Sequence, residues 1–135
     1  MSASIESLKQ VPLFQNLPEK HLKRLADEFV ERKFSEGQEL TAEGSGGVGF
    51  FVLESGTAKV TVDGQDRRTL GPGDYFGEIA LIDGGLRTAT ITATSDGVAQ
   101  GLTAWQFRPL VESSAEIAWP LLEAMARRTR ELEQR

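Results

Sequence analysis

Residues 71–90, GPGDYFGEIALIDGGLRTAT, join a glycine-rich turn, a short apolar run and the start of a β-branched segment. The run is introduced by FGEI at residues 76–79, and one arginine, Arg87, follows a Gly-Gly pair. The Glu78 carboxylate can accept a hydrogen bond from a sugar hydroxyl. A guanidinium close to backbone N–H groups suits the oxygens of a phosphate. The stretch is therefore a candidate sugar-phosphate site.

Each of the two charges also has a structural interpretation. Glu78 suits the first turn of a helix or an exposed position. Arg87 is expected on the apolar face of a strand at 88–94, where an unpaired charge is costly. Its partner is then either a ligand phosphate or an acid of the chain, such as Glu78 or Asp83. A one-residue change of register would instead turn Arg87 to solvent.

Outward from this stretch, short β segments alternate with turn signals about every ten residues. The strands are expected at 30–34, 39–41, 50–54, 58–62, 67–70, 88–94 and 98–103, about eight in all when the central stretch is included. Asp63-Gly64 is a tight hairpin signal. This spacing predicts a mainly β fold with flanking helices, in the form of a sandwich or jelly-roll barrel.

Two short helices are expected before the strands, at 4–11 and 19–29. Ser4 and the region of Asn16 are their expected N-caps. His21 falls among basic residues of the second helix, so we expect it on the solvated surface.

Two further helices are expected after the strands, at 104–111 and 115–134. Because proline fits only the first turn of a helix, Pro120 moves the expected start of the last one to 118 or 119. Its charged end, 126–135, is expected to be solvated. Its apolar stripe serves either packing within the chain or a homodimer, and comprises Ile117, Leu121, Leu122, Met125 and Ala126.

Composition excludes several classes of protein. The 135 residues suit one domain, and 39% hydrophobic residues can supply its core. A net charge of −5 argues against binding nucleic acid or an anionic membrane over the whole surface. With no cysteine and a single histidine, the chain cannot form a thiolate or multi-histidine metal site. No apolar run spans a membrane and no signal peptide opens the chain, so the expected location is the cytoplasm.

Taken together, FGEIALI followed by RTATIT resembles the phosphate-binding cassette of cyclic nucleotide-binding domains, the type found in catabolite activators and protein kinase A regulatory subunits. The resemblance extends to PLF at 12–14, EG at 43–44, the run 50–56 and GPGDYFGE at 71–78. It covers about residues 11–130. It implies a β jelly-roll barrel, also called a double-stranded β-helix, with helices at both ends.

The resemblance also divides the chain and assigns roles. It implies one domain over 1–135, with an N-terminal helical segment 1–29, a barrel 30–103 that contains the cassette 76–89, and C-terminal helices 104–135. Glu78 would accept the ribose 2′-hydroxyl, and Arg87 would pair with the phosphate. The base would lie under the last helix, with Leu121, Leu122 or Met125 as an apolar lid. The implied ligand-binding residues are Phe76, Gly77, Glu78, Ile79, Ala80, Arg87, Thr88 and Ala89.

Two positions depart from the family pattern. Leu86 replaces a proline, which makes the turn into the strand less rigid. Thr88 replaces alanine or serine, and it resembles the threonine that contacts guanine in cyclic nucleotide-gated channels. Cyclic AMP is the favoured ligand, and cyclic GMP stays open because of Thr88.

The implied function is regulatory rather than enzymatic: a stand-alone cyclic AMP sensor that signals by repacking its C-terminal helices. No nucleophile–histidine pair and no metal set support catalysis. The expected partners are a cyclic nucleotide and an unidentified downstream protein, with neither membrane nor, for this chain alone, nucleic acid. The alternatives are a ligand-unresponsive interaction module of the same fold and the truncated sensor part of a transcription regulator.

Overall fold

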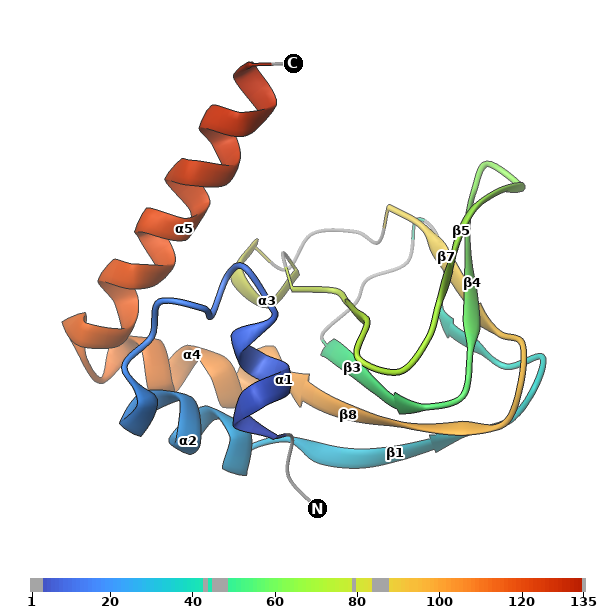
Figure 1. Cartoon of the computed structure of the whole chain (residues 1–135), viewed down its shortest axis with the longest axis horizontal. Helices are drawn as coiled ribbons and strands as arrows, with labels where there is room; N and C mark the ends of the chain where they lie inside the picture. The colour runs from blue at the N-terminus through green and yellow to red at the C-terminus, as the bar shows by residue number, and fades with distance from the viewer. Residues whose placement is uncertain (1–3, 43, 45–48, 79, 84–87, 135) are drawn as a thin grey trace.

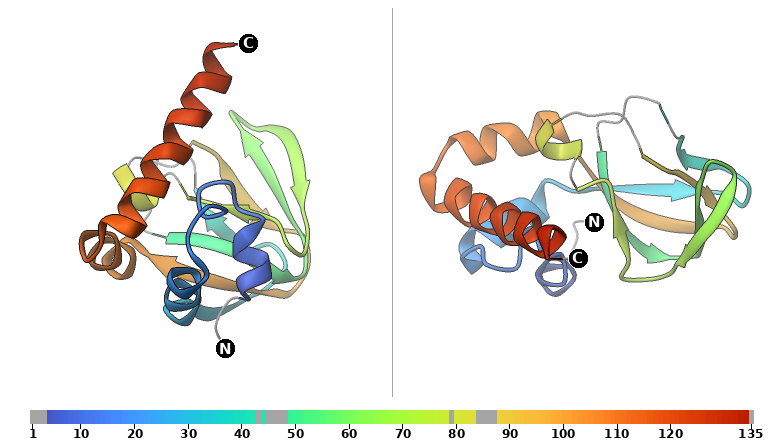
Figure 2. Two further views of the ribbon diagram at one scale, coloured as in Figure 1. Left: turned by 60° about the vertical axis from the view of Figure 1, so that its left-hand side comes forward. Right: turned by 90° about the horizontal axis from the view of Figure 1, so that it is seen from above.

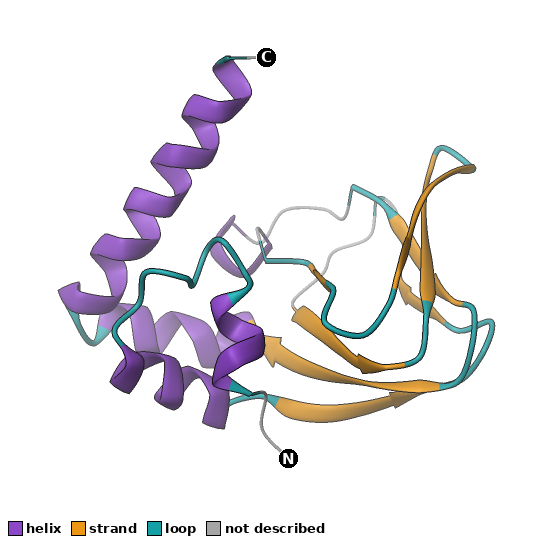
Figure 3. Cartoon of the chain, in the orientation of Figure 1, coloured by secondary structure: helices purple, strands orange, loops and turns teal. Residues whose placement is uncertain are grey.

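The computed structural model describes residues 4–42, 44, 49–78, 80–83 and 88–134. Helices gather on one side of the molecule and strands on the other (Figures 1 and 3). The helices are α1 (Ile5–Lys9), α2 (Glu19–Asp27), α3 (Ala80–Asp83), α4 (Ala104–Glu112) and α5 (Ala115–Glu133). The strands are β1 (Val30–Phe34), β2 (Glu39–Thr41), β3 (Gly49–Ser55), β4 (Ala58–Val62), β5 (Gln65–Leu70), β6 (Tyr75–Phe76), β7 (Thr90–Ala93) and β8 (Gly97–Thr103).

The strands form two antiparallel four-stranded sheets, in the orders β1-β8-β3-β6 and β2-β7-β4-β5. The predicted mainly β fold, jelly-roll-like with helices at both ends, is confirmed. The predicted Asp63-Gly64 hairpin joins β4 to β5, and both residues have positive φ, 53° and 76°. These angles match the tight turns that fit the twist of paired strands. The predicted strand at 88–94 is shorter than expected, because its pairing with β4 begins at Thr90.

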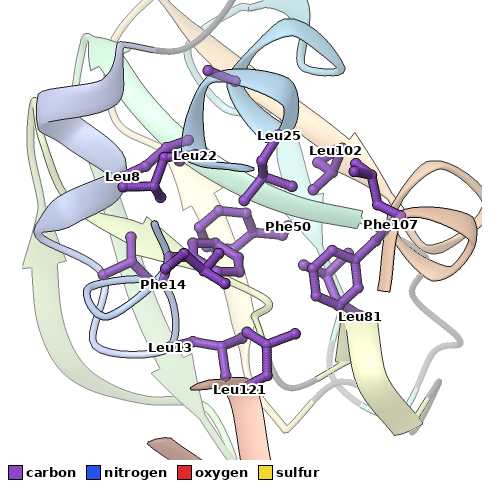
Figure 4. Close-up of a cluster of buried hydrophobic side chains, with 14 of the residues drawn as sticks. Leu8, Leu13, Phe14, Leu22, Leu25, Phe50, Leu81, Leu102, Phe107 and Leu121 are labelled. Atoms are coloured by element: carbon purple, nitrogen blue, oxygen red, sulfur yellow. The ribbon is translucent and has the colours of Figure 1, made fainter. Parts of the chain in front are cut away.

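The buried hydrophobic side chains form two clusters. One fills the space between the sheets and includes Phe34, Leu53, Phe76 and Ile91. The other joins the helices to β3 and β8, with Phe14 and Phe50 fully buried at its centre (Figure 4). The ring centroids of Phe14 and Phe50 are 5.5 Å apart in an edge-on arrangement, which aromatic pairs favour. The helices are thus attached to the barrel by packing rather than by the chain connections alone.

The helix starts follow their caps, with two corrections to the sequence predictions. Ser4 caps α1 as expected, through the N–H of Ser7. The N-cap of α2 is Pro18, which offers no side-chain bond, so the expected cap in the region of Asn16 is wrong. The expected start of the last helix at 118 or 119 is also wrong. Ser114 caps that helix, which begins at Ala115 and contains Pro120.

His21 is buried, not solvated as the sequence predicted. It is 6% exposed and lies on the inner face of α2 with Leu22 and Leu25. Its Nε2 atom is 2.9 Å from Oε2 of Glu116, at the start of α5. The basic neighbours that suggested a surface position occupy the outer face of the helix. The pair joins two helices from opposite ends of the chain.

Candidate functional site

A cavity of about 890 Å³ opens between the barrel, the segment that carries the predicted site, and α5. The barrel contributes Thr41, Val60, Arg68 and Ile91 to its lining. Helix α5 contributes Ala124, Met125, Arg127, Arg128 and Glu131. Figures 1 and 2 show α5 rising from the helical side of the molecule, with its C-terminal end projecting beyond the other helices.

The predicted site begins where the chain passes from one core to the other. Phe76 is anchored between the sheets, 5% exposed, with its ring stacked 5.2 Å from that of Phe51. Leu81 of α3 is buried in the helical core. Between them Gly77 has φ of 90°, in the left-handed region that glycine adopts without strain. The glycine lets the chain turn sharply between the two anchors, with Gly77 and Glu78 in the cavity wall.

Glu78 is the charged residue of the predicted site that the structure describes. Its side chain is 14% exposed, and Oε1 accepts a hydrogen bond from Nη1 of Arg128 at 3.1 Å. Tyr75 also lines the cavity, and burial, reinforced by the Glu78 charge, raises the pKa of its phenol. The uncharged phenol and the paired carboxylate place polar groups of both donor and acceptor type in one wall.

Six of the eight predicted site residues line this cavity, namely Phe76, Gly77, Glu78, Ala80, Thr88 and Ala89. The other two, Ile79 and Arg87, lie outside the described residues. Thr88 and Ala89 form a bend before β7 rather than part of the strand. The hydroxyl of Thr41, on β2, donates to the Ala89 carbonyl oxygen at 3.2 Å and holds this bend against the barrel.

The predicted lid residues separate into three environments. Met125 is half-buried and lines the cavity, together with Ala124. Leu121 is buried in the helical core, with Ile117, so these two serve packing within the chain. Leu122 is 58% exposed, because it lies on the opposite face of α5. Of the three residues named from the sequence, Met125 is the one that faces the site.

Sequence reasoning missed the cations of the cavity. Arg68, on β5, and Arg127 and Arg128, on α5, all contribute to its lining. The charged run 126–135 was expected to be a solvated helix end; Arg128 is exposed as expected, but its ion pair with Glu78 and its place in the cavity wall were not predicted. Nothing in the local sequence separates Arg128 from its charged neighbours. Its partner lies 50 residues earlier, so only the packing of α5 against the site identifies it.

Comparison with protein families agrees with this geometry. The model of the family described as "Cyclic nucleotide-binding domain" matches residues 31–114, more than half of the chain. The chain belongs to the cyclic nucleotide-binding domain family. The matched range contains the barrel, the predicted cassette and α4.

Curated relatives carry the same domain within longer proteins. A cGMP-dependent protein kinase, isozyme 1, of Drosophila melanogaster is 38% identical over 102 residues, which are 70% of this chain and 13% of the kinase. The cAMP-dependent protein kinase type II regulatory subunit of the same organism is 32% identical over 111 residues, which are 82% of this chain and 29% of that subunit. The chain therefore spans less than a third of the length of these relatives.

Solved structures of similar chains share the arrangement of both sheets and helices. The N-terminal domain of a transcriptional regulator from Streptomyces coelicolor A3(2) superposes with a TM-score of 0.84 at 31% identity, over 95% of this chain and 92% of that one. The regulatory domain of Toxoplasma gondii PKA, crystallised with cAMP, gives a TM-score of 0.71 at 32% identity, over 82% of this chain and 44% of that one. Within the described part of this chain, no helix has the length and apolar character needed to cross a membrane.

Proposed function

We propose that this chain is a regulatory module that binds cyclic AMP in the 890 Å³ cavity and transmits binding through its C-terminal helices. One observation carries the proposal: the six described residues of the predicted ligand-binding set line a single cavity that α5 also borders. The volume lies within the range of about 300–1,000 Å³ that is usual for small-molecule sites. We treat 1–135 as one domain built around this site.

The proposed roles follow from the chemistry of each group. Glu78 accepts the ribose 2′-hydroxyl, since its carboxylate faces the cavity and is largely buried. Arg87 pairs with the cyclic phosphate, because a guanidinium matches two phosphate oxygens at once. Backbone groups of Gly77, Ile79 and Ala80 serve the sugar and phosphate. Ala89 offers an amide, and Met125 covers the base with apolar surface.

The proposed signal is a change in the packing of α4 and α5. A ligand shifts such an equilibrium only if it binds one arrangement better than the other. Helix α5 qualifies as the moving element because it borders the cavity and packs on the helical core at the same time. A downstream protein, or a second copy bound through the exposed face of α5, would detect the new arrangement.

Cyclic GMP is the second candidate ligand, favoured by one residue. Thr88 lines the cavity, where its hydroxyl can donate to or accept from a purine. A cGMP-dependent kinase is also among the relatives. Thr88 is exposed and lines the cavity, so a ligand can reach it directly.

Calorimetric titration of the purified protein with cyclic AMP and with cyclic GMP tests the proposal. We expect saturable binding of at least one nucleotide, with cyclic AMP the tighter. Tighter binding of cyclic GMP would transfer the assignment to the second candidate. No binding of either at millimolar concentration would overturn the sensor proposal and favour a ligand-unresponsive interaction module of the same fold. Adenosine 5′-monophosphate, whose phosphate is not closed into a 3′,5′-cyclic diester, is the matched control.

A further inference from the structure

Helix α5 reaches the proposed ribose site through one side chain. Arg128 donates from Nη1 to Oε1 of Glu78 at 3.1 Å. The guanidinium is 52% exposed, whereas the Glu78 side chain is 14% exposed. The contact therefore joins a solvent-facing residue of α5 to a largely buried acceptor of the cassette. Arg127 and Glu131 border the same cavity from the same helix.

This contact leaves the Glu78 carboxylate able to accept further hydrogen bonds. A carboxylate has two oxygens and about four positions that can accept a hydrogen bond. One guanidinium N–H on Oε1 leaves room for a hydroxyl donor on the same group. A bond to a planar, rigid cation also restricts the rotation of the Glu78 side chain. Arg128 thus holds the carboxylate in one orientation without excluding a sugar hydroxyl from it.

We propose that Arg128 is a positioning residue for ribose recognition: it orients Glu78 and so ties the bound 2′-hydroxyl to the position of α5. The inference rests on the proposed function, and it adds a residue that the cassette pattern does not contain. It also supplies a physical link between site and output, because any ligand that fixes Glu78 favours the arrangement in which α5 reaches it.

Calorimetry with cyclic AMP and 2′-deoxy cyclic AMP tests the role in recognition. Arg128→Ala should weaken cyclic AMP binding about two- to fivefold, the range for an ion pair with one half-exposed partner. It should leave binding of the 2′-deoxy analogue unchanged. Arg128→Lys should restore part of the loss. Arg130→Ala, which removes an exposed charge of the same helix that does not line the cavity, is the control and should match the parent.

Two results would overturn the proposal. An unchanged ratio of affinities for the two nucleotides in Arg128→Ala would show that Arg128 does not act through the 2′-hydroxyl. Tighter cyclic AMP binding by Arg128→Ala would show that the ion pair competes with the ligand instead of positioning the acceptor.

A second measurement needs no nucleotide. Hydrogen exchange of the ligand-free protein should speed up about two- to fivefold at amides 125–133 in Arg128→Ala and equally in Glu78→Gln, with no further change in the double variant. Exchange unaffected by either change would overturn the link between the cassette and α5. If the parent binds no cyclic nucleotide, the proposed function and the ribose role fail together, and this exchange experiment still decides whether the pair holds α5.

Discussion

At the scale of single residues, some residues of the site can be predicted from the sequence and others cannot. Gly77 and Glu78 can be predicted as site residues because their order and spacing around an apolar run match a phosphate-binding pattern. The positive φ of Gly77 gives the physical reason for that glycine. The role of Arg128 cannot be predicted from the sequence, since its local surroundings are those of any charged helix end. The sequence does not distinguish Met125, which lines the cavity, from Leu122, which is exposed, because the difference depends on which face of α5 packs against the barrel.

The residue that most directly tests the phosphate assignment is Arg87. Arg87→Ala should weaken cyclic AMP binding by about 2 kcal/mol, or about thirtyfold, because a charge-assisted bidentate contact is removed. Calorimetry of the variant gives the loss. Arg67→Ala, at an exposed position of β5 that does not line the cavity, controls for a general change of charge and should bind like the parent. Parental affinity in Arg87→Ala would mean that another cation receives the phosphate.

At the scale of elements, strands were more predictable than their ends. Alternating and β-branched residues identified β1, β4 and β8 nearly to the residue. The two-residue strand β6 was expected only somewhere in the central stretch and without bounds, because pairing with β3, not local propensity, creates it. For α5 the predicted start at 118 or 119 was wrong because it assumed that Pro120 must lie in the first turn. The Ser114 cap and the packing of Ile117 outweigh the single backbone hydrogen bond that the proline removes.

One strand end depends on the absence of a side chain. A Cβ atom on Gly97 would meet the Ser55 carbonyl oxygen, and would lie 2.5 Å from Cζ of Phe34 and 2.9 Å from Cα of Gly56. Two of these neighbours are backbone, so the strands themselves must separate. Gly97→Ala should therefore lower the free energy of unfolding by about 1–3 kcal/mol, as overpacking does.

Urea denaturation measures that loss, and Gly71→Ala provides the matched control. A Cβ at Gly71 meets no atom within 4 Å, so the control should unfold close to the parent. Equal stability of the two variants would mean that β3 and β8 can separate at this point without cost.

At the scale of the whole molecule, the sequence predicted helices at both ends of a barrel but not how they meet. Residues of α1, α2, α4 and α5 share one core with β3 and β8, an arrangement set by contacts between distant parts of the chain. His21 illustrates the limit. Its basic neighbours suggested the surface, yet the other face of the same helix is the apolar one, and His21 lies on it. Its Nε2 atom has a partner 95 residues away, whereas its buried Nδ1 atom has no hydrogen-bond partner among the described residues.

That partner, Glu116, gives the molecule a pH-dependent joint between its N- and C-terminal helices. Hydrogen bonds from His21 and then from Lys20 lower the pKa of the Glu116 carboxyl below its ordinary value. A carboxyl whose pKa is lower in the folded state contributes stability above its ordinary pKa, and this contribution is lost as pH falls through the lowered value. Glu116→Gln should thus destabilise the protein at neutral pH, and the difference from the parent should shrink in acid. Urea denaturation from pH 7 downward measures it.

Glu112→Gln, whose partner Arg108 lies on the same helix at 3.4 Å, is the local control and should cost little at neutral pH, because a pair within one helix joins no separate parts. A difference between Glu116→Gln and the parent that persists unchanged into strong acid would contradict the ionic nature of the joint.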